Sequence, residues 1–264
     1  MKKLILHIGF GKTGTSFIQS ALAGNQADLL TRDIYYPDHP KLYDASLGKI
    51  TSGNISPDYD LIQTAYKAER NTAAKSILFS NEGLFSDVLN KKEQYVELSK
   101  NFRLHIILYI RDPLPHAISC YQQSIKRGGS TKNIGYYVST VYRHPVILEQ
   151  VLEFLRNIDT DLTVMNYSRY NDDLLNSFYT AIGCSHPKGL SKPTTSRINR
   201  SLTNSENELQ RLFNKYYGAN SRKFISDPLC EELPDIEAEI PYFSKRDYKK
   251  FLDRIEESVT NVNK

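Results

Sequence analysis

The sequence has few cysteines and no long apolar run. Cys120, Cys184 and Cys230 are odd in number and far apart. This spacing predicts neither a disulfide framework nor a cysteine-based metal-ligand cluster. No stretch approaches the about 18 consecutive apolar residues of a membrane-spanning helix, so we expect no transmembrane segment.

A secretion signal is also not expected. Two lysines precede the apolar run Leu4 to Ile8, as in a signal peptide, but the run is short, contains His7, and leads into glycines and a lysine. We therefore expect a cytoplasmic protein and leave peripheral contact with a membrane open.

Composition limits the class of protein without fixing its partner. Charged residues make up 24% of the 264-residue chain and hydrophobic residues 40%, which is typical of a globular domain. A net charge of +4 suits a small anionic ligand as well as a nucleic acid. The basic cluster Lys126-Arg127 and Lys132 lacks the basic-aromatic pattern of a nucleic-acid module, so no nucleic-acid partner is expected. No repeat or linker stands out, and one domain over 1–264 is the simplest organisation.

Short apolar segments alternate with helical periodicity along the chain. The segments expected to form strands lie near 4–8, 33–37, 75–80, 104–110 and 162–165. The run at 104–110 is almost continuously apolar, as in a strand buried on both faces. The alternation predicts an α/β fold, in which a mainly parallel sheet is flanked by helices.

The segment Lys12-Thr13-Gly14-Thr15-Ser16 lies between the first expected strand and a helix. Backbone N–H groups and a helix N-terminus at such a junction can hold an anion. A Walker A loop would need a glycine at position 6, where the chain has Leu6. The pattern G-x-G-x-x-G does occur from Gly9, but glycines recur in ordinary turns, and an ordinary turn stays an alternative here.

Two further strand ends carry polar residues, namely Asn81-Glu82 and Arg111-Asp112. Ligands of open α/β sheets bind beyond the carboxyl ends of the strands, so these residues and the first loop are expected to form one site. Arg111 is a planar, permanently charged donor suited to a second phosphate. Ser119 follows it by eight positions. The alternative for Arg111 is a salt bridge to an acidic neighbour such as Asp112.

Together these motifs resemble those of sulfotransferases. The segment Lys12 to Ser16 is similar to their phosphosulfate-binding loop, Pro-Lys-Ser/Thr-Gly-Thr-Thr, with Gly11 in place of the proline. Arg111 and Ser119 resemble the Arg and Ser, eight residues apart, that hold the 3′-phosphate in that family. The likeness is greater to the bacterial and carbohydrate-type enzymes than to those acting on phenols and steroids. The Arg-Lys-Gly closing motif of the latter is missing. Asn199, Arg200 and Ser201 are the expected nucleotide-closing segment, and an ordinary solvated loop is the alternative for them.

The resemblance implies a sulfotransferase fold and an activity. The donor would be 3′-phosphoadenosine 5′-phosphosulfate (PAPS), the product adenosine 3′,5′-bisphosphate (PAP), and the acceptor a hydroxyl or amine of a carbohydrate or glycolipid. Lys12 would stabilise the leaving phosphate, and the donor would be bound by Gly11, Lys12, Thr13, Gly14, Thr15, Ser16, Arg111, Ser119, Asn199, Arg200 and Ser201. The family needs no metal, and the sequence places no obvious magnesium-binding carboxylate beside the loop.

Glu82 is the expected general base, because it follows a buried strand at the end where the site should lie. A helix-capping or first-turn acid is the alternative for Glu82. His39, in a long loop, is the second choice for the base. His7 and His105 lie within apolar strands and are expected to be packed core residues. Several tyrosines can line an acceptor cleft, with ordinary half-buried surface as an equal alternative: Tyr35, Tyr36, Tyr43, Tyr136, Tyr137 and Tyr142.

Two other functions stay open at this point. One is a P-loop nucleotide or small-molecule kinase, which would bind ATP together with a metal ion. The missing Walker A glycine at position 6 argues against this kinase. A non-catalytic nucleotide-binding protein would bind the bisphosphate without needing Glu82.

Overall fold

The computed structural model describes residues 1–47, 53–56, 58–184, 190, 200–237 and 239–263. The chain divides into two compact units. The first is Met1–Asp112 with Gln150–Thr195, and the second is Pro113–Glu149 with Ser196–Lys264. One domain over 1–264 stays a prediction, because two compact units can belong to one folding domain.

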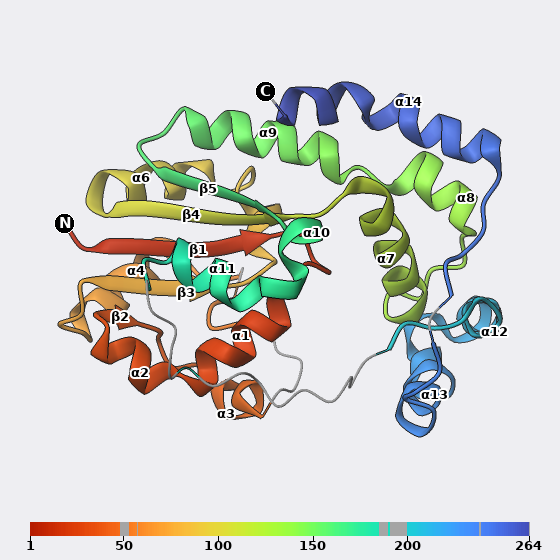
Figure 1. Cartoon of the computed structure of the whole chain (residues 1–264), viewed down its shortest axis with the longest axis horizontal. Coiled ribbons are helices and arrows are strands. Elements are labelled where there is room, and N and C mark those ends of the chain that lie inside the picture. Colours follow the sequence, from red (N-terminus) through yellow and green to blue (C-terminus); the bar gives the residue numbers. More distant parts are fainter. Residues whose placement is uncertain (48–52, 57, 185–189, 191–199, 238, 264) are drawn as a thin grey trace. The chain divides into compact units, whose positions relative to one another are not determined.

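The first unit is built on a five-stranded sheet with the order β2-β3-β1-β4-β5 (Figure 1). Every pair of neighbouring strands is parallel. The strands are β1 (Lys3–Gly9), β2 (Ile34–Tyr35), β3 (Ser76–Ser80), β4 (Arg103–Ile110) and β5 (Asp161–Asn166). This architecture confirms the α/β class with a parallel sheet, and each strand coincides with one of the apolar segments in the sequence.

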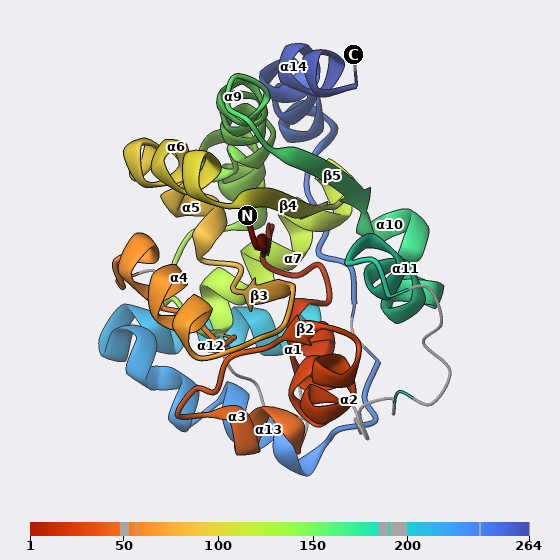
Figure 2. The same ribbon diagram turned by 90° about the vertical axis from the view of Figure 1, so that its left-hand side faces the viewer.

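Helices cover both faces of this sheet. In Figure 2, α4, α5 and α6 lie on one face, and α1, α2 and α11 lie on the other. The bounds in this unit are α1 (Thr15–Gly24), α2 (Gln26–Thr31), α3 (Leu42–Ser46), α4 (Leu61–Arg70), α5 (Leu84–Asp87), α6 (Lys92–Asn101), α10 (Tyr167–Tyr170), the 3-10 turn η2 (Asn171–Asp173) and α11 (Leu174–Ala181). Helix α9 (His144–Arg156) runs from the second unit into the first.

Alternate side chains of the strands form the core beneath α1 and α11. Ile5 and Ile107 pack in one buried cluster with Ile18 and Leu22 of α1 and Phe178 of α11. Successive strand residues point to opposite faces, so the residues between them face α4 to α6. Because both faces are covered, the inner strands β1, β3 and β4 are mostly apolar, whereas the edge strand β5 is more polar and more exposed.

His7 and His105 are core residues, as predicted. They are 1% and 5% exposed, and each ring contacts a hydroxyl on a neighbouring strand, Ser80 at 2.8 Å for His7 and Thr163 at 2.9 Å for His105. Burial lowers the pKa of His7 to about 3 and that of His105 to about 4. Both rings are therefore neutral at physiological pH.

The described part of the second unit is helical. Its elements are α7 (Pro113–Lys126), α8 (Ile134–Tyr136), the π-helical turn η1 (Tyr137–Val141), α12 (Asn204–Tyr217), the 3-10 turn η3 (Gly218–Lys223), α13 (Ser226–Glu232) and α14 (Lys245–Val262), with the first residues of α9. Its core joins α7 to η1 and α14 through Tyr121, Ile125, Val138, Phe251 and Ile255. Within the described ranges, no helix is both long enough and apolar enough to cross a membrane.

Capping residues in the sequence mark some helix starts and not others. The capping box of Thr203 and Glu206 at the start of α12 is present. Ser56-Pro57, a capping serine followed by a proline, predicts a helix start at that point. Helix α4 begins at Leu61 instead, because the Asp60 side chain accepts hydrogen bonds from two backbone N–H groups of the first turn. Pro57 itself lies outside the described residues. The segment 37–57, rich in Pro, Gly, Ser, Asp and His, predicts the long loop that holds His39. In the structure this segment contains the short helix α3.

Candidate anion-binding site

The first loop leaves the centre of the sheet, where β1 meets β4. The Phe10 N–H donates to the Tyr109 carbonyl at 2.9 Å, which carries the β1–β4 pairing one residue past the strand. At Gly9, whose φ is 151°, an added Cβ would lie 2.5 Å from that carbonyl oxygen. Only glycine fits so close to the neighbouring backbone. The loop is therefore held against β4 from its first residue.

Two residues of the loop adopt left-handed backbone conformations. Lys12 has φ 67° and Gly14 has φ 76°. A lysine in this region is uncommon and strained, and such strain clusters at functional sites. When right-handed and left-handed backbone conformations alternate, successive N–H groups point toward one side. This is the geometry of an anion-binding concavity. Lys12 is exposed at this point, so a cation accompanies these donors.

The hydroxyls of the loop have different partners. Thr13 is buried and donates to the Phe10 carbonyl at 2.6 Å, so its hydroxyl fixes the loop. Thr15 and Ser16 are the first two residues of α1, whose leading N–H groups have no partner within the helix. The Thr15 hydroxyl donates to Glu82 Oε2 at 2.6 Å.

Glu82 lies directly beside this loop. An added Cβ at Gly11 would lie 3.8 Å from Glu82 Oε2, and Glu82 itself is exposed. This position agrees with the expectation that Glu82 and the first loop form one site at the sheet edge. Thr15 and Glu82 are 67 positions apart in the sequence and are brought together by the parallel pairing of β1 with β3.

Arg111 meets the same loop from the end of β4. Its Nη1 donates to the Lys12 carbonyl at 3.0 Å, and its guanidinium lies 5.4 Å from the centre of the Tyr167 ring. The alternative of a salt bridge to Asp112 finds no support, since the Asp112 carboxylate instead accepts from the Asn166 amide at 2.8 Å. The first loop, Glu82 and Arg111 thus come together at one edge of the sheet, as the strand-end argument predicts.

A fourth strand end contributes residues that the sequence reasoning missed. Tyr167 follows β5, and an added Cβ at Gly14 would lie 3.0 Å from its ring. Tyr167 therefore contacts both Gly14 and Arg111. Ser168 accepts from the Asp112 N–H at 3.2 Å. The sequence signal for these residues was the polar stretch directly after the segment 162–165. Since β5 pairs with β4, that stretch lies beside Arg111 and Asp112.

The remaining predicted donor-binding residues lie elsewhere in the chain. Ser119 is on α7, in the second unit, whereas Arg111 is in the first. Asn199 lies outside the described residues. Ser201 is half-buried before α12.

Arg200 is occupied by contacts within the second unit. It is 7% exposed, forms a two-pronged pair with Glu206 at 2.7 Å, and donates to the carbonyls of Ser201, Leu229 and Leu233. A guanidinium has five N–H groups, and these contacts use all five. The hydrogen bonds from Arg200 hold the pKa of Glu206 below its ordinary value. This arrangement leaves Arg200 no donor for a nucleotide and gives it a structural role.

The basic cluster has internal partners as well. Lys126 is buried, and its Nζ lies 3.0 Å from Cys230 Sγ and 3.2 Å from the Arg200 carbonyl. Arg127 forms an ion pair with Asp227 at 2.7 Å. Lys132 lies over the Tyr136 ring at 5.0 Å. These three cations therefore contribute to the packing of the second unit.

His39 lines a pocket of ≈ 710 Å³ in the first unit. The pKa of His39 is lowered, because the effect of burial outweighs the opposite effect of the nearby Asp38 carboxylate. Aromatic, amide and carboxylate side chains share the pocket, among them Tyr35, Tyr59, Gln63, Asp58 and Asp60. Of the other tyrosines expected at an acceptor cleft, Tyr36, Tyr137 and Tyr142 are buried, and Tyr43 and Tyr136 are exposed.

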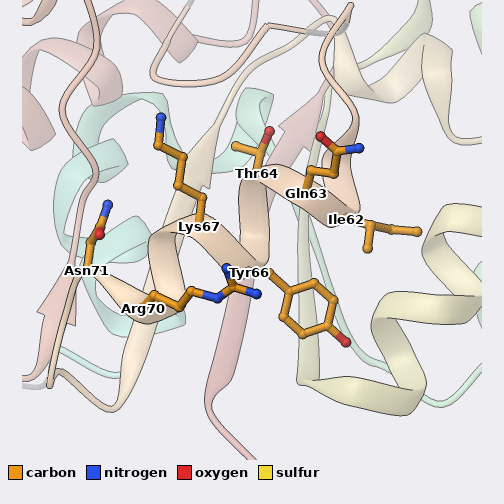
Figure 3. A pocket seen from close by; sticks show the side chains of 7 residues that line it. All are labelled: Ile62, Gln63, Thr64, Tyr66, Lys67, Arg70 and Asn71. Atoms are coloured by element: carbon orange, nitrogen blue, oxygen red, sulfur yellow. The ribbon is translucent and has the colours of Figure 1, made fainter.

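A second pocket, of ≈ 540 Å³, is lined by residues of α4 and by Asn71 at its C-terminal end. Figure 3 shows Thr64 and Lys67 on one side of this helix and Ile62 and Tyr66 on the other. Its lining contains none of the predicted site residues. It shares some lining residues with the His39 pocket, such as Gln63 and Lys67.

Comparisons with known proteins give only weak likenesses. No family model matches the sequence, and no curated protein matches it. A structure of retinol dehydratase in complex with androsterone and the inactive cofactor PAP has a TM-score of 0.36 at 13% identity, covering 98% of this chain and 80% of that one. Another, with retinol and PAP, has a TM-score of 0.38 at 12% identity, covering 97% and 81%. TM-scores this low carry no conclusion about this chain, so the site is interpreted from its own residues.

Proposed function

We propose that this chain is a PAPS-dependent sulfotransferase. The observation that carries the proposal is the contact of Arg111 Nη1 with the Lys12 carbonyl at 3.0 Å, which joins the two motifs of the sequence at one sheet edge. An anion-binding loop with a lysine and a separate arginine suits a ligand that has phosphate groups at two positions.

The residues of the site fit the donor nucleotide. The N–H groups of Thr13 to Ser16 and the Thr15 and Ser16 hydroxyls would hold the 5′-phosphate at the N-terminus of α1. Arg111 would hold the 3′-phosphate. Gly11, in place of the family's proline, would leave the loop more flexible, so that it can adjust to the bound nucleotide. The bound donor supplies the sulfonyl group and leaves as PAP.

Lys12 and Glu82 would carry the reaction. Lys12 neutralises the charge that develops on the leaving phosphate oxygen as the bond between that oxygen and sulfur breaks. Glu82 takes the proton of the acceptor hydroxyl as its oxygen bonds to sulfur. Donor binding would turn the Thr15 hydroxyl from Glu82 to phosphate, which frees the carboxylate to act as the base.

The acceptor is proposed to be a carbohydrate or a lipid-linked glycan. The His39 pocket, in the same unit as Glu82, combines tyrosine rings with amide and carboxylate groups. Such rings present an apolar face beside a polar edge, as sugars do. His39 is then the alternative base.

The test is transfer of labelled sulfonyl groups from PAPS to an acceptor library by wild type and Glu82→Gln. The proposal expects a labelled product with wild type and PAP release in proportion to it. Labelled product formed equally well by Glu82→Gln would reject Glu82 as the base. Absence of any product with sugars and glycolipids, alongside tight PAP binding, would favour the non-catalytic alternative.

The contact of Thr15 with Glu82 favours a second candidate, a magnesium-dependent kinase. In P-loop enzymes the loop hydroxyl and an acidic residue hold Mg²⁺. Leu6, which occupies the position of the first Walker A glycine, is fully buried within β1, so the glycine-rich span of such a loop is missing. Binding of ATP only with Mg²⁺ would support the kinase.

A further inference from the structure

A cluster of three metal-binding side chains lies in the second unit, apart from the residues assigned above. His116 and Cys120 are one turn apart on α7, and His144 is the first residue of α9. One potential ligand atom from each lies within 4.8 Å of the other two. All three belong to the same compact unit. The spacing of the cysteines in the sequence gave no such pattern, because both partners of Cys120 are histidines.

We propose that His116, Cys120 and His144 bind a Zn²⁺ ion. The Cys120 Sγ lies 3.3 Å from His116 Nε2. Two ligands of tetrahedral zinc, a thiolate and an imidazole, lie about 3.6 Å apart at ordinary Zn–S and Zn–N lengths. This pair is therefore already near its metal-bound separation, and a pair at the 4.8 Å limit would have to shorten by about 1 Å.

Tyr142 orients the ligands as an outer partner of a zinc site would. Its hydroxyl lies 2.9 Å from His116 Nδ1, and its ring stacks on His144 at 5.1 Å. A metal-bound histidine commonly donates its other ring N–H to an oxygen, which fixes the ring and its tautomer. With Nδ1–H donating to Tyr142, the Nε2 lone pair points to the thiol. His116 is 0% exposed, so its ring is held in a fixed place.

The backbone that carries Tyr142 is itself unusual. The residues before it form the π-helical turn η1, closed by a hydrogen bond of 2.9 Å from the Tyr142 N–H to the Tyr137 carbonyl. Short π-helical segments occur frequently at functional sites. Here the turn brings Tyr142 and His144 to the His116 face of α7.

Three protein ligands leave a fourth position on zinc for water. Cys120 and His144 are half-buried, so solvent can reach that position. Thiolate with imidazole ligands suits Zn²⁺ and disfavours Mg²⁺ and Ca²⁺. The ion would join the start of α9 to α7 and stabilise the second unit.

The experiment titrates chelator-treated, untagged protein with Co²⁺, which reports thiolate ligation by a charge-transfer band, and then with Zn²⁺. Wild type is expected to show the band at one Co²⁺ per chain, with Zn²⁺ abolishing it. Cys120→Ser and His144→Gln are expected to lose the band, and Cys184→Ser, in the first unit, to keep it. Tyr142→Phe is expected to weaken Zn²⁺ binding by about 10- to 100-fold.

The far-ultraviolet circular dichroism of each variant, measured in chelator, shows whether it is folded. No thiolate–Co²⁺ band in wild type would overturn the proposal, whatever the variants do. A band that persists in folded Cys120→Ser would overturn it too. If Cys120→Ser does not fold, His144→Gln provides the same test from the other helix.

Discussion

Replacing Arg111 with alanine would remove a guanidinium that contacts the loop at the Lys12 carbonyl, 3.0 Å away. If Arg111 also binds the 3′-phosphate, Arg111→Ala loses a charge-assisted interaction of about 1.5–3 kcal/mol. This loss corresponds to a rise in the Kd for PAP of about 10- to 150-fold. Arg111→Lys should recover only part of the affinity, because it keeps the charge and loses the planar fork.

The assay is calorimetric titration with two ligands, PAP and adenosine 5′-monophosphate, which lacks the 3′-phosphate. Arg111→Ala should weaken PAP binding and leave the monophosphate nearly unchanged. Arg156→Ala, an exposed arginine at the end of α9, controls for the loss of one positive charge. Equal weakening of both ligands would mean that Arg111 acts through the loop, and unchanged PAP binding would refute its role altogether.

Four other substitutions test the site and its scaffold. Glu82→Gln should lower turnover by about 100- to 10,000-fold without weakening PAP binding, and wild-type turnover in a steady-state transfer assay would refute its role as base. Gly9→Ala should cost at least about 2 kcal/mol in urea unfolding, because its Cβ would meet the Tyr109 carbonyl at 2.5 Å. Gly24→Ala, with nothing within 4 Å of its added Cβ, should gain about 0.5–1 kcal/mol, and similar effects at the two glycines would contradict the packing argument. The pKa of His7 is lowered from 6.5 to about 3 by burial, so below pH 6.5 the unfolded chain binds a proton that the folded chain does not. Its contribution to stability is therefore complete above pH 6.5 and is lost as the pH falls toward 3; His7→Asn should flatten this dependence, and an unchanged pH profile of unfolding would show that other groups cause it.

The sheet could be predicted from the sequence because both of its faces are buried. Each strand is then a short apolar run, and each run ends where polar residues begin. The same reasoning placed the first loop, Glu82 and Arg111 at one edge, and the contacts of Thr15 with Glu82 and of Arg111 with Lys12 agree with it.

Contacts that depend on the order of the strands or on the packing of helices could not be predicted. Tyr167 reaches Gly14 and Arg111 because β5 lies beside β4, and strand order is not visible in local periodicity. Arg200 has the charge expected of a nucleotide-binding residue, but its partners come from α12 and α13. The cluster of His116, Cys120 and His144 depends on the π-helical turn η1, which local hydrophobic periodicity does not indicate.

Helix starts were uncertain for a local reason. Ser56, Asp58 and Asp60 are all residues that cap helices well, and the sequence offers them within five positions. Asp60 forms the cap, with Leu61 as the first, buried residue of α4. The Leu61 N–H donates to the Gln94 side chain at 3.0 Å, a tertiary contact that a reading of the local sequence does not include.

The central claim is that the loop at Lys12 to Ser16 holds a nucleotide with two separate phosphates and needs no metal to do so. The most direct measurement is the melting temperature of wild type and Lys12→Ala with PAP in the presence of a chelator, and with ATP and Mg²⁺. Ligand at 100 times its Kd adds about 2.7 kcal/mol to stability, which gives a clear rise in melting temperature. We predict that PAP raises the melting temperature of wild type and does so much less in Lys12→Ala. A rise with ATP and Mg²⁺, and none with PAP, would contradict the account.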